Sequence, residues 1–402
     1  MSVTSAAPVA LEAKHAEIVS ATLPLIGAHI DEITGEFYRR MFGNRPELLR
    51  NLFNRGNQAQ GAQQRALAAS IATFASHLVN PELPYPAELL SRIANKHASL
   101  GVTADQYEIV HENLFAAIVH VIGAETVTPD VAEAWDRVYW LMADALIGEE
   151  HDLYADAGVA DGDVYRRVPV LARVDDPSGA IVLTVATSRL DGVAGQYISV
   201  GVTLPDGARQ IRQYSVISKP GSSELAFAVK PVAAVDGNPA GEVSNWIRDH
   251  VRVGDLLDIT TAFGDLPAPV AGKPVVLVSA GIGITPMIGY LEAIADQSPG
   301  TVVHALHADV DEASHPLRQR QRELIAALPN ASLEIWYEQP GGSDVHQGFL
   351  SLEGVSLPDD ADIYLCGANA FVQALRTQLE GRGVATDRIH CELFSPNDWL
   401  LG

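Results

Sequence analysis

The segment 95–114, NKHASLGVTADQYEIVHENL, places an imidazole and a phenol on either side of a helix break at Gly101. Residues 103–106 have the capping-box pattern, with a threonine at the N-cap and a glutamine three residues on, so a helix is predicted to restart there with Tyr107 in its first turn. If the two helices pack across this corner, His97 and Tyr107 can face one cavity. One imidazole nitrogen would then bind a ligand while a partner holds the other. Taken alone, the pair is also compatible with a buried histidine beside a core tyrosine.

The stretch 279–287, SAGIGITPM, has the composition of a nucleotide-binding loop. It follows the apolar run PVVLV directly and leads into a predicted helix. Gly281 and Gly283 would let the backbone approach a pyrophosphate, and the helix N-terminus would supply amide donors. Pro286 stands where the usual dinucleotide fingerprint has a third glycine, so a plain turn between a strand and a helix is the alternative.

A second strand end, YLCGANAFVQAL at 364–375, repeats this design. It places Cys366 and Gly367 at the carboxyl edge of the predicted sheet, where ligands of open α/β sheets bind. We therefore expect Cys366 to face a cofactor, and the alternative is a small residue that fills the core.

The run Arg212-Gln213-Tyr214-Ser215 sets a permanent cation, a flat aromatic ring and a hydroxyl along one predicted strand. Arg212 and Tyr214 are two residues apart and share a face, as a phosphate clamp beside an aromatic shelf requires. A strand of alternating polarity is the alternative. The segment 241–246, GEVSNW, then opens a short helix whose free amides could bind a second phosphate.

The 402-residue chain carries 27 Lys and Arg against 50 Asp and Glu, which gives a formal net charge of −23. This charge repels polyphosphate backbones, so we expect no nucleic-acid partner. An anionic dinucleotide could bind only where backbone amides or a few arginines make a locally positive pocket.

The chain has two cysteines, Cys366 and Cys391, too few for a disulfide framework or a four-thiolate iron–sulfur cluster, which fits a reducing cytoplasm. The N-terminal residues lack a basic region followed by an apolar core, so no signal peptide is expected. The most apolar run, 274–291, is interrupted by glycines and a proline, so no membrane span is expected either. We therefore expect a cytoplasmic protein.

Hydrophobic periodicity divides the chain into an α-helical part, a β-rich part and an alternating α/β part. Apolar residues recur at three and four positions up to Leu153, which indicates an all-α domain. Short β-rich runs separated by Gly, Asp and Pro then indicate an antiparallel barrel, and the later alternation indicates a parallel sheet with helices on both faces. The predicted borders are 1–153 for the helical domain, 154–164 for a linker, 165–269 for the barrel and 270–402 for the α/β domain.

These motifs, taken in order, resemble known families. Arg-x-Tyr-Ser in a barrel, Gly-x-Gly-x-x-Pro and Cys-Gly in the α/β part, and the late segment CELF are similar to the ferredoxin–NADP reductase superfamily. The helical part resembles a globin through EFYRRMF, LFNRGNQAQGAQQRALA, NKHASL, ADQYEIV and LIGEEHDLY. A globin followed by a flavin-binding barrel and a nicotinamide-binding domain is the order found in flavohaemoglobins, and the resemblance runs essentially from end to end.

The resemblance implies a haem b site in the helical domain, with His97 as the proximal ligand of the iron. Tyr107 and Glu150 match the proximal tyrosine and glutamate, which would bond to the inner imidazole nitrogen and push electron density toward the iron. Lys96 matches a lysine that tunes cofactor potentials. On the distal side the matching residues are Tyr38, Gln63 and Leu67, which shape and polarise the oxygen site, and Phe53, which wedges the haem.

The same resemblance implies FAD in the barrel and NAD(P)H in the α/β domain. The residues that match FAD contacts are Tyr197, Arg212, Gln213, Tyr214, Ser215, Gly241, Glu242, Val243 and Ser244, with Lys230 near them. Those that approach the isoalloxazine ring, where the hydride arrives, are Glu392, Leu393, Phe394, Ser395 and Pro396. Those that match the coenzyme site are Gly281, Ile282, Gly283, Ile284, Thr285, Pro286, Cys366 and Gly367.

Three positions depart from the family pattern. His111 stands where a small residue is usual, one helical turn after Tyr107, and could alter the proximal network, although we favour a solvent-facing or edge position. Trp140 is bulkier than common. Ile284 replaces a frequent glutamine and cannot donate a side-chain hydrogen bond, which leaves open the coenzyme affinity and the choice between NADH and NADPH.

The resemblance predicts a nitric oxide dioxygenase. NAD(P)H would pass hydride to FAD, FAD would pass single electrons to haem, and O2 and NO would be converted to nitrate, which detoxifies NO. We also expect a monomer, with a haem pocket that could also hold a lipid.

Two other classes of function stay open. A gas sensor or oxygen store would need a globin but hardly a complete reductase. A reductase of lipid hydroperoxides or quinones would use the same electron path with another acceptor.

Overall fold

The computed structural model describes residues 11–59, 61–187, 193–235 and 238–394 of the chain. The chain forms two compact units, one made mainly of the residues up to Val164 and the other mainly of the residues from Tyr165 onward. The first unit is the expected all-α globin. The second holds the expected antiparallel barrel and the expected parallel sheet with its helices.

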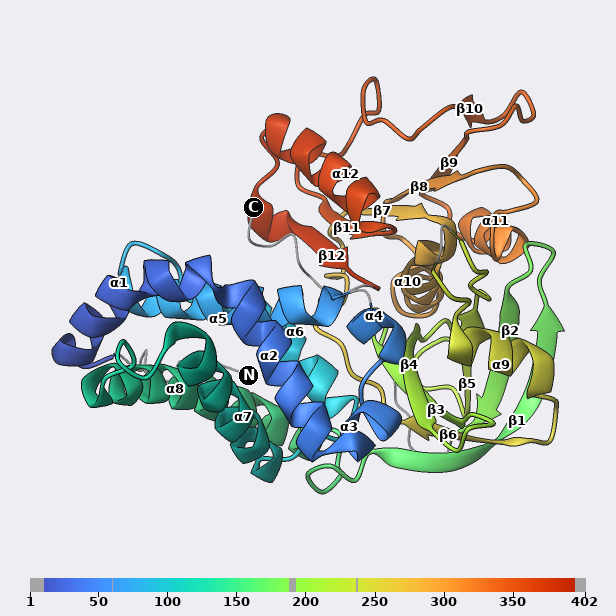
Figure 1. Cartoon of the computed structure of the whole chain (residues 1–402). Coiled ribbons are helices and arrows are strands. Elements are labelled where there is room, and N and C mark those ends of the chain that lie inside the picture. Colours follow the sequence, from blue (N-terminus) through green and yellow to red (C-terminus); the bar gives the residue numbers. More distant parts are fainter. Residues whose placement is uncertain (1–10, 60, 188–192, 236–237, 395–402) are drawn as a thin grey trace. The chain divides into compact units, whose positions relative to one another are not determined.

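The globin unit consists of helices that enclose an apolar core, drawn in blue to teal in Figure 1. Its helices are α1 (Ala13–Ala28), α2 (Ile30–Asn44), α3 (Pro46–Asn51), α4 (Arg55–Ala59), α5 (Ala62–Val79), α6 (Ala87–Ala98), α7 (Asp105–Ile122) and α8 (Pro129–Asp156). Helix α8 begins with Thr128 as N-cap, whose hydroxyl accepts from the Val131 backbone N–H. Because α8 continues to Asp156, the first residues of the predicted linker are helical.

The corner between α6 and α7 lies where the sequence predicted it. Gly101 has a φ of +77°, and a Cβ there would lie 2.9 Å from the Gly162 carbonyl oxygen, so both the turn and the close approach require glycine. The predicted capping box is only half formed. The Gln106 side chain accepts from the Thr103 backbone N–H at 3.2 Å, but the Thr103 hydroxyl donates to Asp105 at 2.6 Å instead of capping the helix.

The barrel part is a six-stranded antiparallel sheet in the order β4-β3-β6-β1-β2-β5. Its strands are β1 (Tyr165–Asp175), β2 (Ile181–Ala186), β3 (Tyr197–Thr203), β4 (Arg209–Ser215), β5 (Glu224–Val229) and β6 (Leu256–Thr260). Alternating burial along β2 shows that one of its faces is turned to the core, as period-2 patterning predicts. The short helix α9 (Glu242–His250) packs its apolar side, with Val243 and Ile247, into the same core.

The α/β part is a six-stranded parallel sheet in the order β10-β9-β8-β7-β11-β12. Its strands are β7 (Val275–Ala280), β8 (Val303–Asp309), β9 (Ala331–Tyr337), β10 (His346–Gln347), β11 (Asp362–Cys366) and β12 (Ile389–Glu392). The helices are α10 (Ile284–Gln297), α11 (Arg318–Ala327) and α12 (Asn369–Gly381).

The strand order of this parallel sheet reverses between β7 and β11. From β7 the chain proceeds outward to β8 and β9, whereas β11 and β12 lie on the other side. Right-handed crossovers therefore place α10 and α11 on one face and α12 on the opposite face, as Figure 1 shows. Ligands of such sheets bind beyond the carboxyl ends of the strands at this reversal, so the fold itself marks the ends of β7 and β11.

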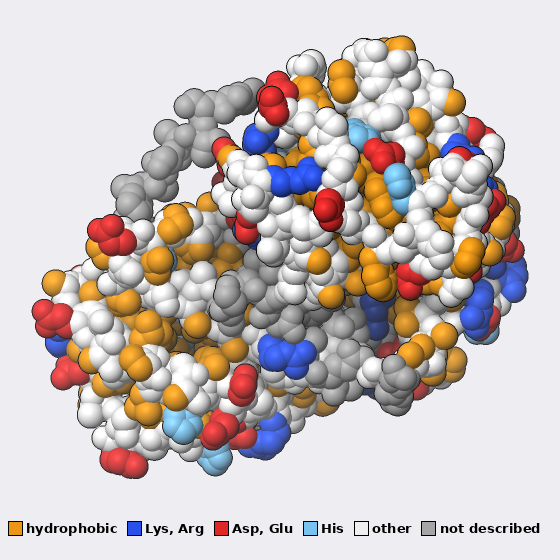
Figure 2. Space-filling view, turned by 90° about the horizontal axis from the view of Figure 1, so that it is seen from above, with side chains coloured by type: hydrophobic (Ala, Val, Ile, Leu, Met, Phe, Trp, Pro, Cys, Tyr) orange, Lys and Arg blue, Asp and Glu red, His pale blue; other side chains and the backbone are white. Residues whose placement is uncertain are grey.

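Charged side chains are dispersed over the face drawn in Figure 2, where lysines and arginines occur in small groups among acidic and uncharged residues. Within the described part of the chain, we find no helix that combines the length and the apolar character needed to cross a bilayer.

Candidate functional site

The proximal site is a hydrogen-bonded triad drawn from three helices. His97, in the last turn of α6, directs Nδ1 to Oε1 of Glu150 on α8 at 2.8 Å and to the hydroxyl of Tyr107 on α7 at 3.0 Å. The Tyr107 hydroxyl donates to the same Oε1 at 2.5 Å. Glu150 and Tyr107 are buried, with 2% and 7% of their surface exposed.

This geometry decides which imidazole nitrogen carries the proton. Because a carboxylate only accepts hydrogen bonds, Nδ1 of His97 must donate to Glu150, and Nε2 then presents its lone pair. Burial and the neighbouring carboxylate raise the pKa of Tyr107, so its hydroxyl keeps its proton and donates. A histidine held in this way is suited to bind a metal through Nε2.

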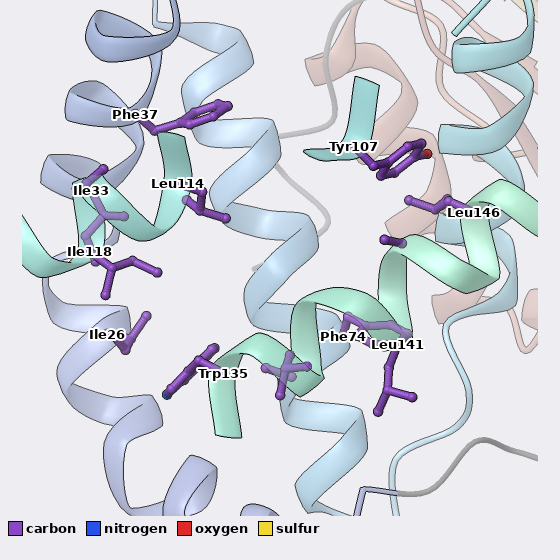
Figure 3. Close-up of a cluster of buried hydrophobic side chains, with 14 of the residues drawn as sticks. Ile26, Ile33, Phe37, Phe74, Tyr107, Leu114, Ile118, Trp135, Leu141 and Leu146 are labelled. Carbon is purple, nitrogen blue, oxygen red and sulfur yellow. The ribbon is translucent and has the colours of Figure 1, made fainter. Parts of the chain in front are cut away.

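His97 lines a cavity of about 300 Å³ inside the globin unit. Figure 3 shows several of the other lining side chains, among them Phe37 on α2, Leu114 on α7 and Trp135 on α8. The walls are mostly apolar. Most of the few polar groups are those that the resemblance assigns to a haem site, and Ser70, Gln106 and Tyr139 are further polar residues of the lining. An imidazole with an available Nε2 in an apolar chamber fits haem b, whose ring is apolar and whose iron takes a histidine ligand.

The same cavity is lined by the residues predicted to lie on the distal side, Tyr38, Gln63, Leu67 and Phe53. Tyr38 is 6% exposed, and its hydroxyl hydrogen-bonds with Gln58, a residue that the sequence did not single out. Gln58 also donates from Nε2 to Oε1 of Gln63 at 2.9 Å. Gln58 lies in a glutamine-rich run, and nothing in its local sequence indicates this role. Only the packing of α4 and α5 against α2 brings it to Tyr38.

Lys96 lies apart from this cavity. It precedes His97 on α6, is exposed, and is not among the residues that line the chamber. Any effect on a cofactor potential would therefore act through its charge and not through contact.

His111 and Trp140, two departures from the family pattern, pack against each other. Their ring centroids are 5.4 Å apart, and His111 also lies 4.4 Å from Phe115. The His111 Nε2 and an oxygen of Asp136 are 2.7 Å apart. His111 is thus half-buried at the edge of an aromatic cluster, which agrees with the edge position among the two that the sequence favoured.

Strand β4 carries the predicted flavin residues. Tyr214 packs its ring on Phe227 at 5.6 Å, and burial raises the pKa of its hydroxyl. Gln213 donates from Nε2 to the Ser199 hydroxyl at 2.9 Å, and Arg212 donates to the Ile211 carbonyl at 2.7 Å. The other members of the set are Ser215 at the end of β4, Tyr197 at the start of β3 and Lys230 directly after β5.

Residues at the N-terminus of α9 form hydrogen bonds with the backbone of Val232. The Ser244 hydroxyl accepts from the Val232 backbone N–H at 3.2 Å, and the Gly241 N–H donates to the Val232 carbonyl at 3.0 Å. Gly241 is the N-cap, and Glu242 and Val243 open the first turn. Free amides at such a helix start are suited to a phosphate.

The glycine loop and the Cys-Gly motif meet in space. A Cβ on Gly283 would be within 2.4 Å of the Cys366 carbonyl oxygen and 2.8 Å of the Gly367 nitrogen, so the backbones are in direct contact. Gly281 and Ile282 form a short turn at the end of β7, and the Thr285 hydroxyl donates to the Ile282 carbonyl at 3.0 Å.

Several residues of the glycine loop and the Cys-Gly motif are buried in the apolar core. Ile284 is the first residue of α10, and its side chain is fully buried in the apolar core. This burial accounts for an apolar residue at the position. Pro286 lies in the first turn of α10, where no backbone N–H is needed. Cys366 is fully buried, and burial followed by the Glu392 carboxylate raises the pKa of its thiol.

The terminal residues are described only in part. Glu392 pairs with Cys366 across β12 and β11, Leu393 follows it, and Phe394 is half exposed. Ser395 and Pro396 lie outside the described residues.

Comparison with known families divides the chain into the same parts. The globin family matches residues 35–146, the oxidoreductase FAD-binding domain matches 180–267 and the oxidoreductase NAD-binding domain matches 277–377. The chain is thus a haem globin joined to a flavin- and nicotinamide-dependent reductase module, and its cofactors are haem, FAD and NAD.

Similar proteins extend over nearly the whole chain. The flavohemoproteins of Bordetella parapertussis and Rhizobium meliloti are 38% and 36% identical, over 94% and 96% of this chain and 96% and 99% of theirs. The solved flavohemoglobin of Malassezia yamatoensis, with bound FAD and heme, is 35% identical with a TM-score of 0.85, covering 96% of this chain and 100% of that one. The chain belongs to the flavohaemoglobin family and is an NAD(P)H oxidoreductase.

We expect His97→Ala to lose haem while FAD stays bound, because the predicted proximal ligand and the predicted flavin residues lie in different units of the chain. The measurement is haem and flavin content per chain after purification. His120→Ala, which removes an exposed histidine of the same unit, should keep both cofactors. Full haem content with an unchanged absorption spectrum in His97→Ala would exclude His97 as the ligand.

We expect Gly283→Ala to slow reduction of the flavin by coenzyme by about a hundredfold, since a methyl group 2.4 Å from the Cys366 carbonyl must displace the loop. FAD content should not change. Gly381→Ala, at a helical glycine of the same unit with open space around it, is the matched control. Stopped-flow flavin reduction tests this, and a rate equal to that of the control would contradict it.

Proposed function

We propose that this flavohaemoglobin is an NAD(P)H-dependent nitric oxide dioxygenase, which converts NO and O2 to nitrate. The observation that carries the proposal is the buried Glu150–Tyr107–His97 triad at the wall of a globin cavity, in a chain that also holds a complete reductase. The flavohem-like FAD/NAD-binding domain of nitric oxide dioxygenase from Vibrio cholerae is 33% identical, with a TM-score of 0.54 over 57% of this chain and 99% of that one.

When bound, haem supplies the iron for oxygen chemistry and FAD converts the hydride of the coenzyme into single electrons. The residues of the chain supply charge and orientation at the haem site. Glu150 places a negative charge on the far side of the His97 ring, which makes Nε2 a stronger donor to a metal. Tyr107 keeps the carboxylate and the imidazole in one orientation by its short hydrogen bond to Glu150.

On the distal side, Tyr38 and Gln63 would bind the oxygen substrate. A buried hydroxyl in an apolar chamber is a strong donor to a small, partly negative ligand because no water competes with it. Gln58 holds both the Tyr38 hydroxyl and Gln63, so it would set the direction of both groups.

In the reductase module, Arg212 and the first turn of α9 would bind the FAD phosphates, with Tyr214 beside the ring system. The loop at Gly281 and Gly283 would bind the coenzyme pyrophosphate through backbone amides. Binding by amides explains how a chain with a net charge of −23 can take anionic cofactors.

The apolar walls of the globin cavity favour one second candidate. Ile26, Ile118 and Trp135 also line it, so it is suited to an apolar chain or ring. A lipid could occupy it, and lipid hydroperoxides or quinones could accept the electrons in place of O2 and NO.

We also propose a cytoplasmic location. The support is that Cys366 and Cys391 are both free and buried, as is common in a reducing compartment.

The deciding experiment is anaerobic reduction of the holoprotein with coenzyme, followed by O2 and then NO, with nitrate measured. Stoichiometric nitrate with continued coenzyme oxidation supports the proposal. Coenzyme oxidation by a quinone or a lipid hydroperoxide, without nitrate from NO, would replace it by the second candidate.

We expect Tyr38→Phe to impair nitrate formation by about ten- to a hundredfold, because one buried hydrogen bond to the substrate is lost. Reduction of a cytochrome-type acceptor by the flavin should continue, since that path does not use the hydroxyl. Tyr85→Phe, the same change at an exposed tyrosine of the globin unit, should leave both activities intact. The measurements are oxygen dissociation rate, nitrate yield and acceptor reduction in one preparation. A parallel fall in all three would mean a loosened fold, and no change would mean that Tyr38 is only a core residue.

A further inference from the structure

A second cavity of the globin unit, of about 360 Å³, lies beside Tyr38. We call it the outer pocket, and its lining residues come from α2, α3, α4 and α5: Gly35, Tyr38, Arg39, Phe42, Leu49, Arg55, Gln58 and Gln64. Gly35 and Arg39 are exposed, so the pocket opens to solvent. Tyr38 also lines the cavity that contains His97, here called the inner cavity, so the two cavities are neighbours.

The Gln58 side chain connects the linings of the two cavities. Gln58 and Gln64 line the outer pocket, whereas Gln63 lines the inner cavity. Gln58 donates from Nε2 to Oε1 of Gln63 at 2.9 Å and hydrogen-bonds with the Tyr38 hydroxyl, while its own Oε1 accepts from Nε2 of Gln64 at 3.1 Å. Because the net contribution of such hydrogen bonds is small, rotation of this one amide group is accessible and would join the cavities.

Gly35 leaves space in the outer pocket. It lies in the interior of α2, where glycine lowers helix stability relative to alanine. A Cβ at this position would meet no atom within 4 Å, so close packing does not require a glycine. The absent side chain instead widens the pocket, and a use for that space would account for the lost helix stability.

The segment that forms the outer pocket is basic, although the whole chain has a net charge of −23. Residues 33–67 contain six arginines and two acids, which gives a formal charge of +4. Arg39 and Arg55 line the pocket itself. An anion that is disfavoured by the chain as a whole is therefore favoured near these two side chains.

The carboxylate beside Arg39 does not cancel this positive charge. Glu36 accepts two hydrogen bonds from Arg39, from Nε and Nη2, each at 2.6 Å, and another from Nε of Arg40 at 2.6 Å. The hydrogen bonds from Arg39 lower the pKa of Glu36 to about 2, so the two guanidinium groups and one carboxylate carry one net positive charge at neutral pH. The pair uses two of the three guanidinium nitrogens of Arg39, so the third can donate to an anion.

We propose that the outer pocket binds small monovalent inorganic anions, and that nitrate formed in the inner cavity leaves through it when the Gln58 amide rotates. The second part rests on the proposed function, because nitrate is the product named there. An anion in an apolar cavity is unfavourable, since its charge has no partner there. Guanidinium groups bind planar oxyanions through charge-assisted hydrogen bonds, so the outer pocket offers nitrate a more favourable position on the solvent side.

The test follows the association of azide, a small anion, with the ferric holoprotein at constant low ionic strength. We expect added nitrate to slow azide association in a saturable manner, by at least about fivefold at saturation, because both anions pass through one site. No NO is present, so this result does not depend on whether the globin forms nitrate. An azide rate that nitrate leaves unchanged would overturn the proposal.

Two charge variants locate the site. Arg39→Gln and Arg55→Gln should each slow azide association by about three- to tenfold and weaken the effect of nitrate. Association of carbon monoxide with the ferrous protein should stay within about twofold, because this ligand is uncharged. Arg137→Gln, at an exposed arginine that lines neither cavity, is the control and should leave all three measurements unchanged. An effect of nitrate that persists in full in both lining variants would mean that nitrate binds elsewhere.

A third variant fills the pocket without changing its charge. Gly35→Leu should slow azide association by about tenfold while haem content stays normal, because the new side chain occupies the passage. Gly43→Leu is the matched control, since Gly43 lies on the same helix, also has open space around a Cβ and lines neither cavity. Equal azide rates in the two variants would contradict the proposal.

The role in product release has its own measurement. With O2 and NO, Gly35→Leu should form as much nitrate as the unaltered protein in a single turnover but slow steady-state turnover by about tenfold. A steady-state rate equal to that of Gly43→Leu would exclude release through the outer pocket. Absence of nitrate in the unaltered protein would instead refute the proposed function, and the azide experiments would still decide whether the pocket binds anions.

Discussion

The globin site depends on one buried carboxylate. Glu150 is almost wholly removed from water, and an isolated carboxylate in the interior would cost several kcal/mol. Tyr107 and His97 provide the hydrogen bonds that offset this cost, and charge-assisted bonds of this kind contribute about 1.5–3 kcal/mol each. Since the three residues come from α6, α7 and α8, these helices must meet in one arrangement for the charge to be satisfied. That arrangement also directs the imidazole toward the cavity.

The reductase module depends on a close approach of backbones. Gly283 lies against the Cys366 carbonyl, so the loop after β7 is seated on the end of β11. This contact occurs at the point where the strand order reverses, where the sheet leaves room for a ligand. The amide donors of the loop are then held by the sheet and need no charged side chain to orient them.

The net charge of the protein and the groups in contact with a bound anion have opposite effects on anion binding. The overall charge of −23 disfavours anions at long range, but salt screens exposed charges beyond about 8–10 Å. Binding of an anionic coenzyme is therefore a matter of the groups within contact distance. Amides at the start of α10 would attract the pyrophosphate in the proposed coenzyme site.

The sequence by itself determined the fold class, the order of the parts and the positions of most motifs, because these follow from signals within a few residues. The break at Gly101, the glycine loop and the alternation of strands with helices are of this kind. It also marked His97 and Tyr107 as a pair across one corner, with a core histidine as the alternative. Glu150 entered only through resemblance, since it lies 53 residues from His97 and nothing in its own segment distinguishes it from other acids.

Only the tertiary structure decided which residues meet. Gln58 hydrogen-bonds with Tyr38, and His111 packs against an aromatic cluster. The Cys366 side chain lies in the core, while its backbone contacts the glycine loop. The reason is physical. Local patterns fix which face of an element is apolar, but the partner of a polar side chain is set by how helices and strands pack, and a buried polar group must find its partner in that packing.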